Sequence, residues 1–447
     1  MAKSKAQKAF IEATETKIKP NAIATVENEE PDYKSESYKI RKIIDPIKQS
    51  YSFRFNQITN QIEFKKNTEK EFHPWNPRDL KNLWVELKLK NIRVNKIDLK
   101  DMVGSNLVSD DYNPFKEYLY GLPKWDYSTD HIKQYLEQVY LSDEENRTDF
   151  ILSFKKWFVA YVASLDSDPI VNQHCFVLVG GQGKFKTTFL NNLVPKHLRL
   201  DYLFSSKFNF EHKDHYKHLG TKMLINLDEL ATLSRTDVGV LKTILTDDRI
   251  ITRFSYGEFD THMWRRASFC GSTNNEQFLS DETGNRRFLC FKIDNIVLDK
   301  DFDLDFIYAQ ALALYKDGFK FWFDREDIAN IEEKNERFFN TTIEQDLIQH
   351  YIEKPSEQDI KYGFNVQYKT ATDINIWLAG KSNRININET TKGRVGSILR
   401  KLGYKQISKR LSNSNTPMKV WCVRYVDTPK FVDELGHLEN KQDDLPI

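Results

Sequence analysis

Residues 175–188 constrain the fold of this chain more than any other stretch, because they join an apolar run, a glycine-rich turn and a helix start. CFVLV is followed by Gly180-Gly181-Gln182-Gly183-Lys184-Phe185-Lys186-Thr187-Thr188 and then by the helical pattern FLNNLV. Glycines let backbone amides turn toward phosphate oxygens, and the start of the following helix adds a partial positive charge. The segment predicts a phosphate-binding loop (P-loop) for a nucleotide, in which Lys186 reaches the terminal phosphates and the Thr187 hydroxyl holds Mg²⁺.

Phe185 departs from the commonest form of such a loop, because it stands where the last glycine is expected. We expect a larger residue there to need a negative φ and a shifted loop, which puts nucleotide affinity in question. Taken alone, these residues also fit a glycine-rich turn followed by a chance Lys-Thr pair.

Two further apolar runs end in polar residues: KMLINLDE ends at Asp228-Glu229, and ASFCGSTNN ends at Thr273-Asn274-Asn275. The alternation of such runs with turn and helix patterns is typical of an α/β domain with a largely parallel sheet. Ligands of these sheets lie beyond the carboxyl ends of the strands, so all three endings would face one site. In a nucleotide hydrolase, Asp228 would support the Mg²⁺ shell, Glu229 would be the catalytic base, and Asn274 would help to place the attacking water. Singly, each ending is also a common solvated strand end.

The run from Lys222 to Phe288 resembles the virulence-associated protein E family of phage, plasmid and genomic-island proteins, which are related to superfamily III helicases of the AAA+ class. Its shared segments, in family order, are LDEL, DDRIITRFSYGE and RRASFCGSTNNEQFLSDETGNRRF, with NPFKEYLYGLPKWD as a lead-in. The resemblance covers roughly residues 110–325. It implies a ring-forming ATPase that uses ATP and Mg²⁺ at the replication of a mobile element.

The same resemblance assigns a role to Arg286 and Arg287, which match the paired arginines of the TGNRR motif. One of them would be an arginine finger, a cation from a neighbouring subunit that stabilises the transition state of phosphoryl transfer. This role implies a homo-hexameric ring with the ATP site at a subunit interface. The alternative is that both arginines are ion-paired at a sheet edge.

The stretch RFSYGEF, between the second and third apolar runs, corresponds to a hairpin that superfamily III helicases project toward single-stranded DNA. Basic residues beside aromatics suit backbone contact and base stacking. The candidate contacts are Lys242, Arg249, Arg253 and Tyr256. A core hairpin with its aromatics packed inward is the alternative.

The chain as a whole is nearly neutral, with 66 basic and 65 acidic residues, which taken at face value argues against a nucleic-acid partner. Residues 370–425, however, hold eleven Lys and Arg against two acids, so this stretch carries +9 and the remainder −8. Its pattern of helix, helix and two strands predicts a winged helix whose second helix, residues 390–402, enters the major groove of duplex DNA. The candidate contacts are Lys392, Arg394, Arg400, Lys401, Lys405, Lys409, Arg410 and Lys419. A solvated basic face that docks on the acidic remainder is the alternative.

A length of 447 residues suits two or three domains. We expect an α/β chain in six parts: a flexible arm (1–35), a small mixed α/β accessory domain (36–122), a P-loop AAA+ ATPase domain with a parallel sheet (123–330), a helical linker (331–369), a winged helix (370–426) and a flexible acidic tail (427–447). About 120 residues precede the ATPase without a convincing cluster of metal-binding acids, so we expect no primase activity and allow for a separate primase or origin-binding partner.

The cysteines Cys175, Cys270, Cys290 and Cys422 lack metal-ligand spacing, and no apolar run approaches the roughly 18 residues that span a bilayer. We therefore expect a cytoplasmic protein with no membrane contact. The function that these features favour is an ATP-dependent DNA helicase or translocase in replication initiation of a mobile element. The alternative is a nucleotide-binding and DNA-binding scaffold or regulator without turnover. A nucleotide-triggered switch in host defence is a third reading, for which we find no sensing domain.

Overall fold

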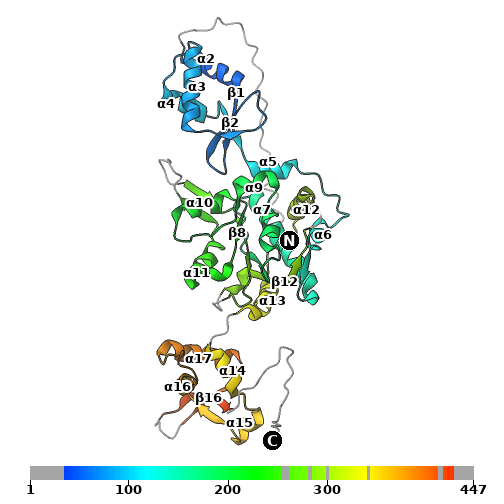
Figure 1. The fold of residues 1–447 in the computed structure, drawn as a ribbon, viewed down its shortest axis with the longest axis vertical. Helices are drawn as coiled ribbons and strands as arrows, with labels where there is room; N and C mark the ends of the chain where they lie inside the picture. The colour runs from blue at the N-terminus through cyan, green and yellow to red at the C-terminus, as the bar shows by residue number, and fades with distance from the viewer. Residues whose placement is uncertain are drawn as a thin grey trace, which may run out of the picture. The chain divides into compact units, whose positions relative to one another are not determined.

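The computed structural model describes residues 35–252, 261–279, 284–298, 302–339, 343–410 and 416–426 (Figure 1). The chain divides into two compact units, Met1–Glu117 and Tyr118–Ile447. Arg253, Tyr256, the predicted tail and, except for Ser35, the predicted arm lie outside the described residues. Among the described helices, none combines the length and the apolarity that a membrane crossing requires.

The first unit packs helices against a four-stranded sheet, which confirms a mixed α/β region. Its strands are β1 (Tyr51–Asn56), β2 (Gln61–Lys66), β3 (His73–Pro74) and β4 (Ser109–Tyr112), in the order β3-β2-β1-β4. Strands β1 and β2 form an antiparallel hairpin whose turn includes Asn60 in the left-handed region, at φ 56°. The helices α2 (Glu36–Ser50), α3 (Pro77–Leu89) and α4 (Lys96–Gly104) contribute Ile47, Leu87 and Leu99 to the core of this unit.

The second unit is built on a six-stranded sheet in the order β5-β12-β6-β11-β8-β7. Its strands are β5 (Val139–Leu141), β6 (Cys175–Val179), β7 (Leu203–Phe204), β8 (Leu224–Leu227), β11 (Ser268–Thr273) and β12 (Phe288–Ile296). Neighbouring strands run parallel except for β5, which is antiparallel to β12. The three apolar runs of the sequence form β6, β8 and β11, and every residue of these strands is buried, as expected for the centre of a parallel sheet.

Helices of the second unit pack around this sheet (Figure 1). They are α6 (His131–Leu136), α7 (Arg147–Asp166), α8 (Lys186–Asn191), α9 (Lys196–Tyr202), α10 (Lys213–Thr221), α11 (Arg235–Ile244), α12 (Leu304–Lys316) and α13 (Arg325–Asn335), while α5 (Pro114–Gly121) includes the last residues of the first unit and the first of the second. The aromatic side chains of Trp157, Phe158 and Tyr161 on α7 are fully buried, and the last two stack edge-on or tilted against Tyr308 of α12. A separate antiparallel hairpin consists of β9 (Arg249–Thr252) and β10 (Thr261–Trp264).

The carboxyl-terminal part of the chain is a smaller set of helices and strands. It comprises α14 (Ile343–Tyr351), β13 (Ile352–Glu353), α15 (Glu357–Tyr362), β14 (Gln367–Lys369), α16 (Ala371–Lys381), α17 (Glu389–Lys401), β15 (Gln406–Lys409) and β16 (Met418–Tyr425). We expected residues 331–369 to be a helical linker, but β13 and β14 both pair with β16. Strands β13 and β14, which lie within the predicted linker, are therefore part of the same sheet as β16.

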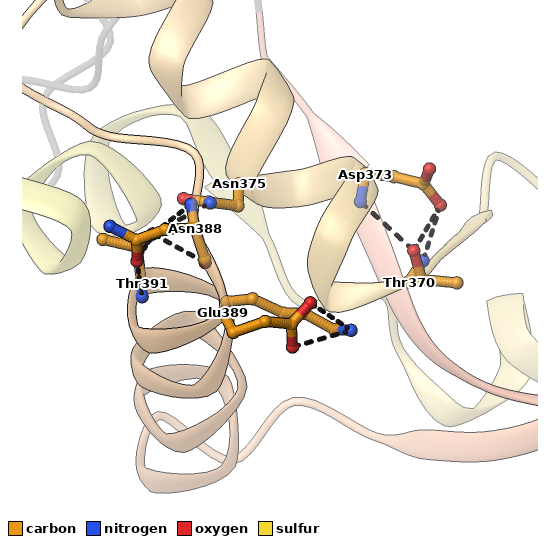
Figure 2. A network of polar contacts seen from close by, with 7 residues as sticks. Thr370, Asp373, Asn375, Asn388, Glu389 and Thr391 are labelled. Carbon is orange, nitrogen blue, oxygen red and sulfur yellow. Dashed lines mark hydrogen bonds and ion pairs between the residues drawn. The ribbon is translucent and has the colours of Figure 1, made fainter.

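Polar caps explain where α16 and α17 begin. Thr370 accepts a hydrogen bond from the Asp373 backbone, and Asn388 accepts one from the Thr391 backbone, so each forms a capping box (Figure 2). Asn375 of α16 donates to the Thr391 hydroxyl at 3.2 Å, which ties the two helices together. The predicted apolar face of α17 is confirmed, because Val395, Ile398 and Leu399 are all buried.

Candidate functional site

The loop between β6 and α8 is shaped by close packing at its start. A Cβ atom at Gly180 would lie 2.6 Å from the carbonyl oxygen of Ile293 on β12, so the chain admits only glycine there. Gly183 follows in the left-handed region at φ 77°. The loop then enters α8 at Lys186.

Phe185 keeps the backbone conformation that a glycine would adopt, which corrects the expectation of a negative φ. Its φ is 57°, in the left-handed region, and its side chain is 57% exposed. This conformation costs a non-glycine residue roughly 1–2 kcal/mol. The exposed ring avoids a clash with the loop, so the substitution does not require a shift of the backbone out of this region.

Lys186 is the buried cation of the loop, with 6% of its surface exposed. Its ammonium donates to the carbonyl oxygens of Gly180 and Gly181, each at 2.7 Å, and to Oδ1 of Asn274 at 2.8 Å. Burial lowers the pKa of Lys186, while the nearby Asp228 carboxylate opposes that shift. The structure therefore joins the end of β11 to the loop through one ammonium group.

A second polar cluster lies at the end of β8, where the Asp228 carboxylate is the common acceptor. Its Oδ1 accepts hydrogen bonds from the hydroxyls of Thr187 at 2.9 Å and Ser272 at 2.6 Å. Sequence reasoning missed Ser272, although it lies two residues before Asn274, a spacing that places both side chains on one face of a strand. The next residue, Glu229, turns the chain with φ 56° and exposes its side chain.

These groups surround one open hollow of about 320 Å³. It is lined by Gln182, Gly183, Lys184, Phe185, Lys186, Thr187, Thr188, Asp228, Glu229, Ser272, Thr273 and Asn274. The carboxylate and hydroxyl oxygens are the hard donors that Mg²⁺ prefers. Among the described residues, no group of three His, Cys, Asp or Glu side chains could hold a metal ion. A cation in this hollow would therefore take further ligands from phosphate groups and water.

Arg286 and Arg287 lie at the opposite edge of the sheet. They occupy the short turn η3 (Asn285–Arg287) that leads into β12. The parallel register aligns Phe288 with Cys175 and Lys292 with Val179. The arginine turn therefore lies at the amino ends of β12 and β6, whereas the hollow lies beyond the carboxyl end of β6. A five-residue strand spans about 17 Å. The two arginines are therefore not brought to the hollow of their own chain.

The positive charges of Arg286 and Arg287 affect the pKa of His174, the residue before β6. Burial, followed by the charges of Arg287 and Arg286, lowers the pKa of His174 to about 4. Burial and the charge of Arg286 also lower the pKa of Arg287. Among the described residues, neither guanidinium has an ion-pair partner, and both the arginine-finger role and the alternative of ion pairs at a sheet edge stay predictions.

The hairpin candidates for DNA contact differ in exposure. Arg249 is exposed on β9 and lies 4.6 Å from the ring centroid of Trp264 on β10. Lys242 corrects our expectation, because it is 7% exposed and lies beside Gly284. It occurs on the buried side of α11 together with Leu241 and Leu245.

Arg265 is a residue at the base of this hairpin that sequence reasoning passed over. Its guanidinium is 1% exposed and donates to the carbonyl oxygens of Asp247, Ala267, Asn172 and Leu245, at 2.7 to 3.0 Å. Four carbonyl acceptors compensate a buried charge that has no acidic partner in these contacts. Arg265 therefore anchors the hairpin to the end of α11 and to the segment before β6.

The basic residues of the carboxyl-terminal part fall into two groups. Arg394 pairs with the largely buried Glu344 of α14 at 3.0 Å, an internal contact that the sequence did not indicate. Exposed basic side chains occur at Arg400, Lys401, Lys405, Lys409, Arg410 and Lys419, while Lys392 is half-buried. Lys409 lies 3.3 Å from the ring centroid of Tyr368, and Lys392 lies 3.4 Å from the Glu389 carboxylate.

Comparisons with known proteins were made on the sequence and on the fold. A family model described as the virulence-associated protein E-like domain matches residues 119–340. Among curated proteins, none matches. A solved structure titled "The apo structure of NrS-1 C terminal region (305-718)" is similar at 12% identity and a TM-score of 0.43, over 87% of this chain and 99% of that chain. "The A form apo structure of NrS-1 C terminal region-CTR" is similar at 13% identity and a TM-score of 0.40, over 86% and 99%.

Proposed function

Because residues 119–340 place this chain in the virulence-associated protein E-like family, we propose that it is an ATP-dependent DNA helicase or translocase in the replication of a mobile genetic element. In this proposal, the second unit contains a P-loop ATPase domain of the AAA+ class. ATP and Mg²⁺ bind at the hollow beside α8, and the active assembly is a homo-hexameric ring. The ring acts on single-stranded and duplex DNA, with a separate primase or origin-binding partner where one is needed.

One observation carries the proposal: a buried lysine, a helix start, a carboxylate, two hydroxyls and an amide meet at the carboxyl edge of a parallel sheet. Lys186, Asp228 and Asn274 follow three different strands, and they lie in two adjacent hydrogen-bonded clusters that line one hollow. A chance Lys-Thr pair after a glycine-rich turn would not explain why the ends of β8 and β11 converge on the same loop. The arrangement supports binding of a nucleoside triphosphate through its phosphates.

Five residues of the hollow have roles in the proposed hydrolysis. The Lys186 ammonium exchanges its bonds to Gly180 and Gly181 for oxygens of the terminal phosphates. Thr187 and Asp228 would hold Mg²⁺, which would supply positive charge beside the phosphates. Glu229, exposed at the rim, accepts the proton of the attacking water, and Asn274 orients that water.

The arginine turn supports hydrolysis between subunits. Arg286 and Arg287 lie at the amino edge of the sheet, so they are separated from their own hollow by the length of β6 and β12. A pair of guanidiniums, one exposed and one half-buried, with no acidic partner among the described residues suits a role toward the phosphates of a neighbouring chain. We assign the arginine finger to one of these two residues.

The carboxyl-terminal elements support contact with duplex DNA. The helix pair α16–α17 and the strands β15–β16 follow the order of a winged helix, and α17 buries Val395 and Leu399 on its inner face. Its outer basic residues, including Arg400 and Lys401, would meet the groove, and Lys409 and Lys419 would neutralise phosphates. Arg394, which pairs with Glu344 and keeps 38% of its side chain exposed, stays a weaker candidate for this contact.

The test of the proposal is a single-turnover ATPase assay of the wild type and of Glu229→Gln, with and without single-stranded DNA. We expect hydrolysis by the wild type, stimulation by DNA, and a loss of roughly 10²-fold or more in the variant, within the range for general-base catalysis. Wild-type activity no higher than that of Glu229→Gln under both conditions would leave the scaffold without turnover as the better reading.

A second measurement tests the DNA contact separately. The proposed module includes β13 and β14, so the deletion that removes it whole starts at residue 343 rather than at α16. We expect the truncated chain to lose duplex affinity and much of its salt dependence while basal ATPase activity continues. Unchanged duplex affinity would favour the alternative that the basic face docks on the acidic part of the chain.

A further inference from the structure

We propose that Asn335 is a positioning residue for the arginine finger, a role that rests on the proposed hydrolysis between subunits. Asn335 is the last residue of α13 and is 1% exposed. Its side-chain amide donates to the backbone carbonyl oxygens of Asn285 and Phe288, both at 2.9 Å. These two carbonyls bracket Arg286 and Arg287, so one buried amide group clamps both ends of the arginine turn.

The clamp itself is held by a well-anchored helix. Asp324 and Asp327 form a capping box that begins α13. The same Asp327 carboxylate accepts a hydrogen bond from Lys156 of α7 at 2.7 Å, and Lys156 is 6% exposed. Helix α13 is thereby joined to α7, the long helix whose aromatic residues fill the core of the unit. The position of Asn335 is therefore set by the body of the domain rather than by the surface turn that it holds.

The segment after α13 also contacts the strand end that reaches the hollow. The backbone amide of Leu279 donates to the carbonyl oxygen of Phe338 at 3.0 Å, and Leu279 follows Asn274 by five residues. Asn274 in turn accepts from Lys186. Both the arginine turn and the segment that follows β11 are thus fastened to residues 335–338.

Loss of the Asn335 contact would change the position of the arginine side chains rather than the chemistry that they perform. Arginine side chains are long, so a small rotation of the turn moves each guanidinium by a larger distance. A misplacement of about 1 Å at a catalytic group can cost on the order of 10²-fold in rate. Without the amide of Asn335, the Phe288 carbonyl loses this donor, the Asn285 carbonyl keeps the Phe288 backbone N–H of the turn itself, and the turn loses its contact with α13. We expect a fall in kcat with little change in KM for ATP, because the hollow of the same chain is untouched.

The first experiment measures steady-state ATPase activity of Asn335→Ala and Asn335→Leu in the full chain. Leucine fills a similar volume and removes the donor, so it separates the hydrogen bonds from the packing. Asn172→Ala is the matched control, since Asn172 is 2% exposed and donates to the Trp157 carbonyl at 3.0 Å without touching the arginine turn. We expect kcat to fall by roughly 10- to 100-fold in both Asn335 variants and to stay within about 2-fold in the control. Melting curves and binding of a fluorescent ATP analogue verify that each variant is folded.

The second experiment mixes Asn335→Leu with Lys186→Ala. Each chain alone is impaired, but a junction that combines the hollow of the Asn335 variant with the arginines of the Lys186 variant is intact. We expect the mixture to hydrolyse ATP several-fold faster than the sum of the two separate samples. Such recovery would not occur if the Asn335 substitution only damaged its own hollow.

The outcomes distinguish this inference from the function on which it rests. A wild type that fails to hydrolyse ATP overturns the proposed function. A wild type that is active, with Arg286→Ala/Arg287→Ala inactive and Asn335→Leu fully active, overturns the positioning role alone. A mixture with no recovery, or a control that loses as much activity as the Asn335 variants, also overturns the positioning role.

Discussion

The carboxyl ends and the amino ends of the strands in the central sheet, called here its carboxyl edge and amino edge, are organised in opposite ways. At the carboxyl edge, the polar groups satisfy one another within the chain: Lys186 has three oxygen acceptors, and Asp228 accepts from two hydroxyls. At the amino edge, the backbone around Arg286 and Arg287 is clamped, while the charged heads have no ion-pair partner among the described residues. The polar groups of the first edge are paired within the chain, whereas the second edge presents two guanidiniums without such pairs in the described part of the chain.

This difference shows how one sheet can supply both halves of an active site without bringing them together. Strand β6 carries the phosphate-binding loop after Val179 and starts at Cys175, beside the first residue of β12. The parallel register fixes the arginine turn and the loop at opposite ends of the same strands. In a ring, the arginine edge of one subunit would face the hollow of the next. Breaking either edge should abolish activity, but in mixtures of variants the defects should complement each other.

The largest effect is expected from removing both arginines. Arg286→Ala/Arg287→Ala should reduce ATP turnover by about 10³-fold or more, the range measured for arginine fingers, while ATP binding stays close to that of the wild type. Turnover and nucleotide affinity, measured on the same samples, check this. If affinity and turnover fall together, the arginines act on the hollow of their own chain and the contrast between the two edges is wrong.

Lys186→Ala should reduce turnover by roughly 10²- to 10³-fold and should also weaken nucleotide binding. The reason is that this ammonium is the buried cation of the hollow, 6% exposed and held at the loop by three acceptors. Lys196→Ala, an exposed lysine at the start of α9, serves as the control and should leave both quantities unchanged. Normal ATP affinity in Lys186→Ala would contradict the assignment of the loop.

The carboxyl edge was predictable from the sequence because its signals are local. An apolar run followed by glycines, by two acids or by an amide identifies a strand end, and parallel strands bring such ends together. Lys186, Asp228 and Asn274 were all found in this way. The left-handed φ of Phe185 was not foreseen, because side chains other than glycine rarely adopt it. In the structure the ring is exposed and does not clash with the loop.

The amino edge depended on contacts between distant segments, which periodicity does not reveal. The amide of Asn335 reaches carbonyls about 50 residues away, and Arg265 reaches Asn172 across 93 residues. Likewise, the burial of Lys242 and the pairing of Arg394 with Glu344 follow from packing against other elements. A basic residue on a helix therefore indicates charge, but only the fold decides whether that charge faces outward.

A pH effect is expected at the amino edge, through His174. The pKa of His174 is lowered from 6.5 to about 4 by burial and by the arginine charges, so at pH 5 the unfolded chain binds a proton that the folded protein excludes. Stability should therefore fall as the pH drops from about 6.5 toward 4. His174→Gln should remove about 2 kcal/mol of the loss of unfolding free energy between pH 7 and pH 5.

Denaturant unfolding at the two pH values checks this difference. His73→Gln, at an exposed position in the other unit, provides the control for the removal of a histidine away from the arginine turn. An identical difference for His174→Gln and the wild type would mean that this histidine is not held neutral by the arginine turn and its surroundings.

The smallest effect is expected from Ser272→Ala, which tests how firmly the groups at the carboxyl edge hold Asp228 in place. Ser272→Ala removes one of the two hydroxyls that donate to Asp228, so the carboxylate is less firmly oriented toward Mg²⁺. We expect the Mg²⁺ concentration for half-maximal ATPase activity to rise about 10-fold, as for other outer-shell partners of a metal ligand. Ser268→Ala, on the same strand, is the matched control, because the buried hydroxyl of Ser268 lacks a hydrogen-bond partner among the described residues. Equal Mg²⁺ requirements in both variants would show that Thr187 alone is sufficient to orient Asp228.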